Sequence, residues 1–550
     1  MNNNAVGNKL LSIDKIVYFW SILFILPIIY VTIFNRETVI RNFNYIWGFL
    51  FVAYLFYTNR TSIANNKSLP ATTISNKALI TFFITIFISI SYSLVVKLYS
   101  FHENAWDFGI FQSMLEAMTH GDFGYSSIVG FYHFSVHQNY ILLLILPFYY
   151  LLHSPVTLQF ITAIAILLQG VILWLIMQDK KLNPLLAFVI VVAYFLSPFN
   201  GIVCGFHPEL LAPTFFAASY LFYIRKKLFY FTLMIMLLAF TKEECALYII
   251  GFGIYLLINK KYSYASIAIF IAVFITLLNN FIVQPYFVHK SGMLNAPTLS
   301  YWAQWGTTKS EIVLNMLTHP WQIITSIFRV DSGFWKLYGL LGFMLIFDSF
   351  ILLTSMLPIF LLGTTQNETM FHYGGYYAVM LNIILFISLT RIAYILKYIN
   401  SPDDTSIAGF YVTKKALLFY NKLFRGRLQQ LLLLLIIIFP LVGFGYQRFY
   451  PIDFNDITGF TKVRQVLLPK YHHHTILPAA NLYPNLLDLP LNFSAFDERD
   501  FFKPANRVIV FTPIGDQWPF TKEQLKNKAH RLKRQCDVIG NFYICNIITR

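Results

Sequence analysis

The chain has 550 residues, of which 57% are hydrophobic, 18% are aromatic and only 12% are charged. With a mean hydropathy of +0.59, this composition excludes an ordinary soluble globular protein, because one water-surrounded core would not absorb that much apolar surface. The formal net charge of +16 suits contact with anionic lipid, whereas no nucleic-acid-binding pattern, Gly-rich phosphate loop or internal repeat accompanies it. We therefore expect a polytopic α-helical membrane protein that binds no nucleic acid.

Thirteen apolar runs are candidate transmembrane helices, since about 20 mostly apolar residues are needed to cross the hydrocarbon with every backbone group bonded inside one helix. They are residues 16–34, 43–58, 77–99, 156–177, 184–199, 210–224, 228–240, 244–258, 263–287, 334–346, 349–363, 372–396 and 430–446. The first run is too long for a cleaved signal peptide and no small-residue cleavage site follows it, so we expect it to be retained.

Lys and Arg in short loops indicate the cytoplasmic side of a membrane protein. The basic connections are residues 178–183, 224–227, 259–261 and the longer stretch 397–427. All of them fall on one side if the N-terminus is cytoplasmic and the apolar stretch 141–152 is a helix half-embedded at the outer surface. Residues 334–363 then form two short crossings divided at Asp348.

This topology divides the chain into three parts. An N-terminal transmembrane helix pair occupies 1–76, and a transmembrane core with a long first external loop at 100–155 occupies 77–449. Residues 450–550 then form a small extracytoplasmic domain of mixed α and β structure, in which 507–512 predicts a strand and 521–535 an amphipathic helix.

The last stretch, 536–545, predicts a hairpin on a Gly540-Asn541 turn, with Gly first as a type II′ turn requires. Counting back from that turn places Cys536 opposite Cys545, at a separation that permits a disulfide in an oxidising compartment. Two free buried cysteines are the alternative. Cys204 and Cys245 are expected to be lone thiols.

Under this topology all 13 histidines lie on the external side, and four external clusters combine histidines or lysine with acids. The clusters are "HENAWDFGIF" with the rest of its loop (Glu103, Asp107, His133, His137), "SPFNGIVCGFHPELLAP" (His207, Glu209), "FTKEECALY" (Lys242, Glu243, Glu244) and "NETMFHYGGYY" (His372). Ionisable groups at membrane depth are costly, so they usually face a cavity or a partner. Any chemistry should therefore face outward.

Each cluster also has a simpler interpretation. Glu209 and Glu243 or Glu244 lie in first helical turns, where the helix dipole favours a carboxylate by about 0.3–1 kcal/mol. In the same simpler interpretation, Asp107 only marks the start of a helix. His133 and His137 have the i, i+4 spacing of a helical metal pair, but no third ligand is fixed by the sequence, so ordinary hydrogen bonding at the interface is the stronger interpretation.

Five stretches occur in the order found in the bacterial membrane proteins grouped as domain of unknown function 2079. They are "WDFGIFQSMLEAMTHG", "HFSVHQNYILLLILPFYYLLHSPVTLQF", "LSPFNGIVCGFHPELLAP", "TKEECALYIIGFGIYLL" and "FHYGGYY". From about residue 80 onward the chain resembles that family, which in turn resembles the GT-C superfamily of glycosyltransferases. Those polytopic enzymes take a sugar from a polyprenyl-phosphate carrier, so the resemblance implies a multi-pass enzyme of the bacterial cytoplasmic membrane.

The resemblance also implies a catalytic base near the start of the first external loop, and by position Asp107 matches it best, with Glu103 second. The chain departs from the superfamily in two ways. The runs 16–34 and 43–58 precede the helix that leads into this loop, so the usual first helix would be third here. Glu103 and Asp107 are four positions apart rather than adjacent, which leaves the need for a divalent cation open.

Sugar transfer from a phosphate carrier needs a base on the acceptor and cationic or hydrogen-bonding groups on the departing phosphate. Asp107 is the candidate base, and Lys242, His207 and His372 are candidates for the phosphate. The expected partners are a polyprenyl-phosphate sugar donor, a lipid or glycan acceptor and the bilayer. Two other classes remain: a transporter or flippase of a lipid-linked saccharide, which should tolerate Asp107→Asn, and a non-catalytic assembly protein, in which no single acid matters.

Overall fold

The computed structural model describes residues 13–36, 38–39, 73–197, 199, 205–329, 332, 334–335, 348–372, 375–398, 448–451, 453–495, 501–502, 507–514, 520–532 and 536–547. The predicted crossings 43–58 and 430–446 lie outside these residues. So do Cys204, most of the predicted crossing 334–346 and nearly all of the basic stretch 397–427.

Within the described ranges, five helical segments are long and apolar enough to cross a membrane. They are α1 (Ile13–Phe34), α3 (Asn76–Tyr99), α6 (Pro155–Asp179), the continuous segment α11 (Tyr262–Leu278), η5 (Asn279–Val283) and α12 (Gln284–Lys290), and the segment Tyr376–Ile395 of η7 (Gly375–Ala378) and α19 (Val379–Tyr398). Six shorter helices complete the bundle: α5 (Leu142–Leu152), α7 (Pro184–Leu196), α8 (Ala212–Ile224), α9 (Leu228–Ala239), α10 (Cys245–Ile258) and α17 (Ser349–Gly363). The expectation of a helical, multi-pass membrane protein is confirmed, and the predicted runs agree with these helices to within a few residues, apart from the start of α19.

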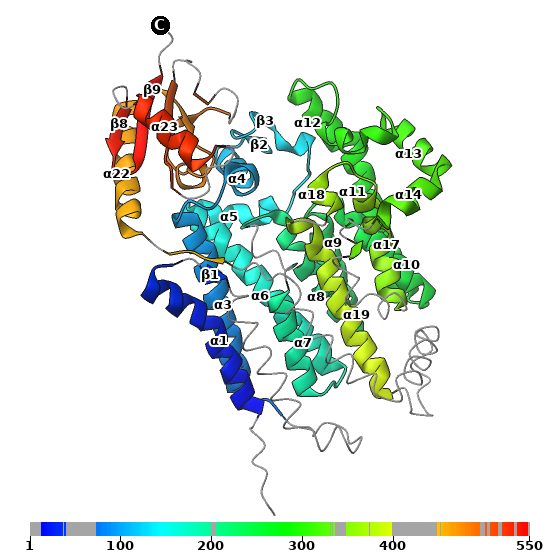
Figure 1. Ribbon diagram of the computed structural model, residues 1–550. Helices are drawn as coiled ribbons and strands as arrows, with labels where there is room; N and C mark the ends of the chain where they lie inside the picture. Colours follow the sequence, from blue (N-terminus) through cyan, green and yellow to red (C-terminus); the bar gives the residue numbers. More distant parts are fainter. Residues whose placement is uncertain are drawn as a thin grey trace, which may run out of the picture.

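Single polar residues cap the start of several of these helices. Ser75 caps α3 by accepting a hydrogen bond from the Ala78 N–H, and Ser154 and Asn183 cap α6 and α7, each followed by proline at the first helical position. Helix α5 lies across the end of the bundle and not along α6 (Figure 1). Its placement agrees with the prediction that 141–152 does not cross.

One buried ion pair ties four helices of the bundle together. Asp348 caps α17 and accepts hydrogen bonds from Arg391 of α19 at 2.9 and 3.1 Å. Arg391 also donates to Tyr220 of α8 and Tyr255 of α10, at 3.2 and 2.7 Å. Asp348 thus begins α17 as the predicted split requires, but it is fully buried and paired rather than placed in an exposed connection.

Beyond α12 the chain forms helices that the sequence analysis leaves unassigned. These are η6 (Pro297–Trp305), α13 (Lys309–Thr318) and α14 (Pro320–Ile327). Thr308 and Glu311 form a capping box at the start of α13. Together with the short helix α18 (Glu368–Phe371), these helices lie at the same end of the bundle as α12 (Figure 1).

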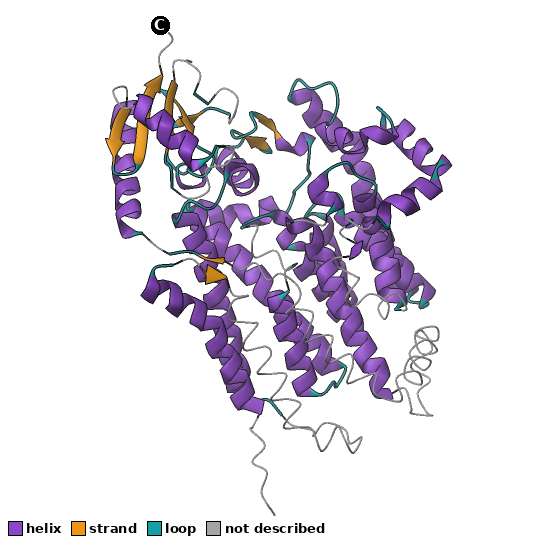
Figure 2. Ribbon diagram, in the orientation of Figure 1, coloured by secondary structure: helices purple, strands orange, loops and turns teal. Residues whose placement is uncertain are grey.

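The C-terminal domain is a five-stranded mixed sheet covered on both faces by helices (Figure 2). Its strand order is β6 (Asn492–Phe493), β5 (Thr475–Pro478), β7 (Arg507–Phe511), β9 (Phe542–Ile547) and β8 (Cys536–Ile539), with β5 parallel to both β6 and β7 and the other pairs antiparallel. Alternate side chains of β7 face opposite ways: Val508 and Val510 pack with α22 (Phe454–Tyr471), and Ile509 and Phe511 with α23 (Lys522–Leu532).

The predicted elements of this domain are confirmed. β7 occupies the predicted strand 507–512, and α23 lies within the predicted helix 521–535. In the hairpin, Ile539 pairs with Phe542 and Cys536 with Cys545, and the two cysteines form a disulfide. Gly540 has φ +59°, whereas Asn541 is not among the described residues with positive φ, as a type II′ turn requires.

The C-terminal domain packs directly on the start of the first loop. The ring of Phe101 packs against the rings of Phe460 and Phe542, at centroid distances of 5.2 and 5.4 Å. The side-chain amide of Asn485 donates to the Leu98 carbonyl at 3.0 Å. The last part of the chain therefore holds the end of α3 and the loop that follows it.

Candidate functional site

Asp107 lies in a short π-helical turn, η1 (Ala105–Gly109), that leads into α4 (Ile110–Thr119). Asn104 caps this turn, because its Oδ1 accepts hydrogen bonds from the Trp106 and Asp107 N–H groups at 3.0 and 3.4 Å. Asp107 therefore lies at a helix start, as the simpler interpretation expects. The capping itself is done by Asn104, which leaves the carboxylate of Asp107 for another role.

Glu103 is almost completely buried and held from three sides. Its Oε2 lies 3.2 Å from Lys97 Nζ, and its Oε1 accepts a hydrogen bond from Gln159 at 2.9 Å. Gly205, with φ +69°, packs so closely that a Cβ there would lie 2.3 Å from Glu103 Oε1. Burial raises the pKa of Glu103, and the charge of Lys97 partly offsets this.

Asp107 is less enclosed than Glu103. Its side chain is partly buried, and within the described ranges no hydrogen bond to its carboxylate is found. Burial raises the pKa of Asp107, while the positive charges of Lys97 and Lys242 act in the opposite direction. Asp107 thus lies within the electrostatic reach of lysines that come from two separate parts of the chain.

Glu209 lies between two other predicted residues, His207 and Lys242. Its Oε2 contacts His207 Nδ1 and its Oε1 contacts Lys242 Nζ, and all three side chains are at most 4% exposed. Glu209 lies in the first turn of the short helix η4 (Pro208–Leu210), and its two oxygens are directed to His207 and Lys242. Helix capping alone therefore does not account for Glu209.

Two tyrosines of the fourth cluster complete this arrangement. The ring of Tyr376 stacks on His207 with centroids 3.6 Å apart and an interplanar angle of 17°. Lys242 Nζ lies 5.3 and 5.1 Å from the ring centroids of Tyr376 and Tyr377, and 3.6 Å from Glu244 Oε2. Burial lowers the pKa of Lys242, but Glu244 and the tyrosines outweigh it, so the pKa is raised and the ammonium stays charged.

The first loop is tied to the α9–α10 connection by Glu243. His137 Nδ1 lies 2.6 Å from Glu243 Oε1, and the Gln138 N–H donates to Oε2 at 3.3 Å. Burial raises the pKa of Glu243, yet His137 and Lys242 outweigh it and bring the pKa to about 2. Neighbouring Glu244 precedes α10 without a side-chain capping bond, so capping alone does not explain that residue either.

The two buried histidines of the site are neutral near pH 7. Burial lowers the pKa of His133 to about 3 and that of His207 well below its usual value. Phe111 separates them, with its ring edge-on to both, at 5.6 Å from His133 and 4.6 Å from His207. The rings of His133 and His137 are 5.6 Å apart, and nowhere in the described ranges are three or more His, Cys, Asp or Glu residues grouped to hold a metal ion.

We call the side chains of these segments that contact one another or interact electrostatically the charged network. Its members are Lys97, Glu103, Asp107, His133, His137, Gln159, His207, Glu209, Lys242, Glu243, Glu244, Tyr376 and Tyr377. The structure therefore brings together the predicted residues of the first three clusters. His372 instead lines a separate cavity with Arg329 and Glu368, among other residues.

Lys97, Gln159 and the two tyrosines are absent from the predicted site residues. Lys97 had a signal, since it is the one charged residue in the last turn of the apolar helix that leads into the loop. The tyrosines had none, because their residue type is common throughout the chain. Their position depends on how α19 begins.

Residues 97–441, well over half of the chain, match the family described as predicted membrane protein, DUF2079. The chain belongs to this family. No curated protein matches this DUF2079 chain. Its match to the family begins at Lys97 and covers the described members of the charged network.

Among solved structures, the DUF2079 chain is similar to ArnT from Cupriavidus metallidurans bound to undecaprenyl phosphate, with a TM-score of 0.47 and 10% identity over 86% of this chain and 99% of that one. The apo state of the same protein gives a TM-score of 0.45 and 10% identity, over 86% of this chain and 98% of that one. The arabinofuranosyltransferase AftD from Mycobacteria gives 0.43 and 12% identity, over 88% of this chain and 40% of that one.

Proposed function

We propose that this chain is an integral membrane glycosyltransferase of the bacterial cytoplasmic membrane. It transfers a sugar from a polyprenyl-phosphate donor to an envelope acceptor at the outer face, with Asp107 as the general base. The observation that carries the proposal is the convergence of Asp107, Glu209 and Lys242 at one end of a bundle of apolar helices. A substrate with a lipid tail and a charged head requires this combination of an apolar surface and a buried polar site.

Asp107 suits the role of base better than Glu103. Glu103 is 2% exposed and already bound to Lys97 and Gln159, so an acceptor hydroxyl could approach it only by breaking those contacts. Asp107 is more accessible. Its raised pKa makes it a stronger base than an ordinary aspartate, and proton transfer is most effective when the pKa lies near the working pH.

The proposed reaction balances with these groups alone. The acceptor O–H gives its proton to Asp107 as its oxygen bonds to the anomeric carbon. The bond from that carbon to the phosphate oxygen breaks, and its electron pair leaves with the phosphate. Positive charge develops on the sugar ring in the transition state, while these bonds form and break, and the departing oxygen needs a cationic or hydrogen-bonding partner.

Lys242 is the candidate partner of the phosphate. It stays protonated although it is 1% exposed, and the hydroxyls of Tyr376 and Tyr377 lie in the same region. Glu209 and Glu244 already contact Lys242, so the phosphate either replaces one of them or arrives with a divalent cation. An assay of sugar transfer with and without a metal chelator distinguishes these two routes, because only the second route needs the cation.

The test compares cells that carry the wild-type protein, Asp107→Asn and Asp122→Asn at equal expression. Asp122 is a matched control, because it is an acid in the same loop whose side chain is 44% exposed and 3.9 Å from Lys290. Loss of a general base lowers transfer by roughly 10² to 10⁴. Asp107→Asn should therefore leave an envelope glycan without its sugar and accumulate the lipid-linked donor, while Asp122→Asn matches wild type.

An unchanged glycan and lipid profile in Asp107→Asn cells would overturn the assignment of the base. If Glu209→Gln or Lys242→Met abolishes the addition of the sugar to the glycan while Asp107→Asn does not, the polar site binds or moves a lipid-linked saccharide without reacting. If none of the three changes matters, the charged network is structural.

A further inference from the structure

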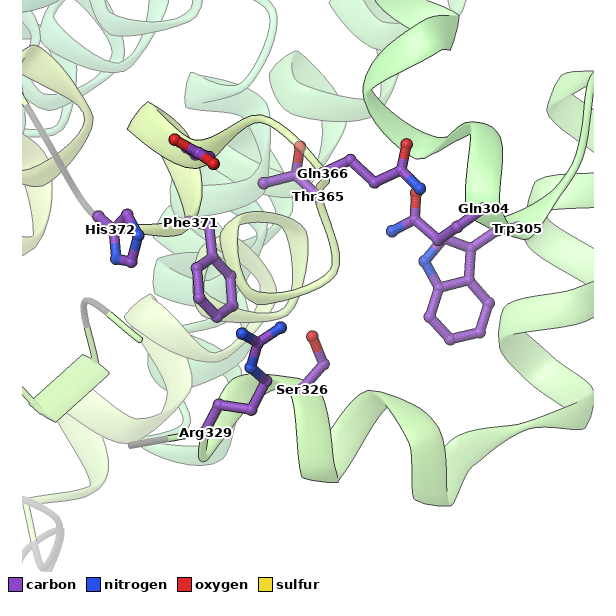
Figure 3. A pocket seen from close by; sticks show the side chains of 9 residues that line it. Gln304, Trp305, Ser326, Arg329, Thr365, Gln366, Phe371 and His372 are labelled. Carbon is purple, nitrogen blue, oxygen red and sulfur yellow. The ribbon is translucent and has the colours of Figure 1, made fainter. Parts of the chain in front are cut away.

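A cavity of about 450 Å³ lies beside the charged network, lined by residues that the proposed reaction does not use. Its walls are Gln304, Trp305, Ser326, Arg329, Thr365, Gln366, Glu368, Phe371 and His372 (Figure 3). They come from η6, from α14 and the residues after it, and from the segment that links α17 to α19. This volume falls within the range of small-molecule sites, roughly 300 to 1,000 Å³.

Hydrogen bonds between these segments fix the shape of the cavity. The Thr364 carbonyl accepts from both Gln304 Nε2 and Trp305 Nε1, at 2.6 and 3.0 Å. The Gln366 N–H donates to the Tyr301 carbonyl at 2.8 Å. Ser326 Oγ donates to the Gly363 carbonyl at 2.5 Å. The walls are therefore held in place without a ligand, which reduces the ordering that binding would require.

The side chains of the cavity favour a neutral ligand with many hydroxyl groups. The lining has one guanidinium and one carboxylate, from Arg329 and Glu368, so it offers no excess of positive charge to an anion. The amide groups of Gln304 and Gln366 can each donate and accept, which matches neighbouring hydroxyls on a ring. Figure 3 shows the rings of Trp305 and Phe371 among these polar groups, and the Arg329 guanidinium lies 5.0 Å from the centroid of the Phe371 ring.

We propose that this cavity binds a saccharide. Its place next to the charged network assigns the saccharide to the acceptor side of the reaction. Gln366 of the cavity wall donates its backbone N–H to the Tyr301 carbonyl, and Tyr301 interacts electrostatically with Tyr377 of the network. The cavity and the network therefore adjoin. The acceptor role rests on the proposed transferase function, whereas saccharide binding itself does not.

Ligand-observed saturation-transfer NMR on the purified full-length protein in detergent tests this proposal. The probes are the methyl glycosides of glucose, galactose, mannose, rhamnose and N-acetylglucosamine at millimolar concentration, with inorganic phosphate as the anionic comparison. At least one glycoside should receive saturation from the wild-type protein. Gln366→Ala and Glu368→Ala should weaken its binding about fivefold or more, the effect of losing a hydrogen-bonding group.

Both altered side chains are exposed, so the variants should fold, and a monodisperse elution profile checks this. Gln178→Ala is the matched control, since Gln178 is exposed at the far end of α6 and should leave binding unchanged. The proposal is overturned if no glycoside binds, if binding is the same in Gln366→Ala as in wild type, or if phosphate displaces every glycoside.

Asp107→Asn separates this inference from the proposed function. Glycoside binding that survives in Asp107→Asn, with cellular glycans unaffected by that change, supports the saccharide site and rejects the transferase. An Asp107-dependent glycan change without glycoside binding supports the transferase and rejects the saccharide site.

Discussion

Replacing Asp348 by alanine removes one side of an ion pair that lies inside the helix bundle. Asp348 is 0% exposed and Arg391 3% exposed, and both oxygens of Asp348 accept from the guanidinium. The substitution leaves the Arg391 guanidinium buried without its carboxylate, although it still donates to the hydroxyls of Tyr220 and Tyr255, and it removes the cap of α17. Breaking a buried pair in this way costs about 3–5 kcal/mol in the free energy of unfolding.

The chain supplies a control of the same chemistry at its surface. Arg225 donates to both oxygens of Asp179 at 2.7 and 3.3 Å, with side chains 38% and 27% exposed. Because water screens such a pair, Asp179→Ala should lower the free energy of unfolding by no more than about 1 kcal/mol. The two substitutions thus remove equivalent contacts that differ in burial.

Titration with SDS in mixed micelles, followed by tryptophan fluorescence, gives the free energies of unfolding. The double substitution Asp348→Leu and Arg391→Met should recover most of the loss, because it removes both charges and fills the space with apolar groups. The reasoning is refuted if Asp348→Ala destabilises the protein no more than Asp179→Ala does, or if the double variant is as unstable as the single one.

Three further predictions concern the charged network and the C-terminal domain. Since the pKa of Asp107 is raised, Asp107 should take up its proton at a higher pH than an ordinary aspartate does. A pH–rate profile should therefore show the transfer rate falling already above the usual pKa range of an aspartate as the pH is lowered. A transfer rate that stays unchanged down to pH 4 would contradict this. Gly205→Ala places a methyl group against Glu103, so it should lower the yield of folded protein by size-exclusion chromatography more than alanine does at the open position Gly292. Cys536→Ser with Cys545→Ser removes a bond that closes a short loop, which should destabilise the C-terminal domain by about 2–3 kcal/mol; unchanged proteolysis of that domain would count against it.

The C-terminal hairpin could be predicted to the residue pair because its determinants are local. The position of Gly540 fixes the turn, and counting outward from the turn fixes the partners of Cys536 and Cys545. The helices at those predicted crossings that lie within the described residues could be placed for a similar reason, since a run of apolar residues is a property of one segment. Neither prediction required knowledge of which helix lies beside which.

Pairings between distant segments could not be predicted in this way. Glu209 and Lys242 were both candidates, but their contact depends on how η4 and the α9–α10 connection pack. Arg391 lies in an apolar run and showed no sign of a partner until α17 and α19 were in place. His372 was preferred in its cluster because of its residue type, whereas the structure brings Tyr376 and Tyr377 to the network and leaves His372 in the cavity.

The packing of Phe101 against Phe460 and Phe542 has a consequence for biogenesis. During translation the first loop emerges hundreds of residues before the aromatic rings that hold it. At 5 to 20 residues per second, the interval until both rings have been made is roughly 20 to 90 seconds. The start of the first loop therefore lacks these packing partners until the ribosome has nearly finished the chain.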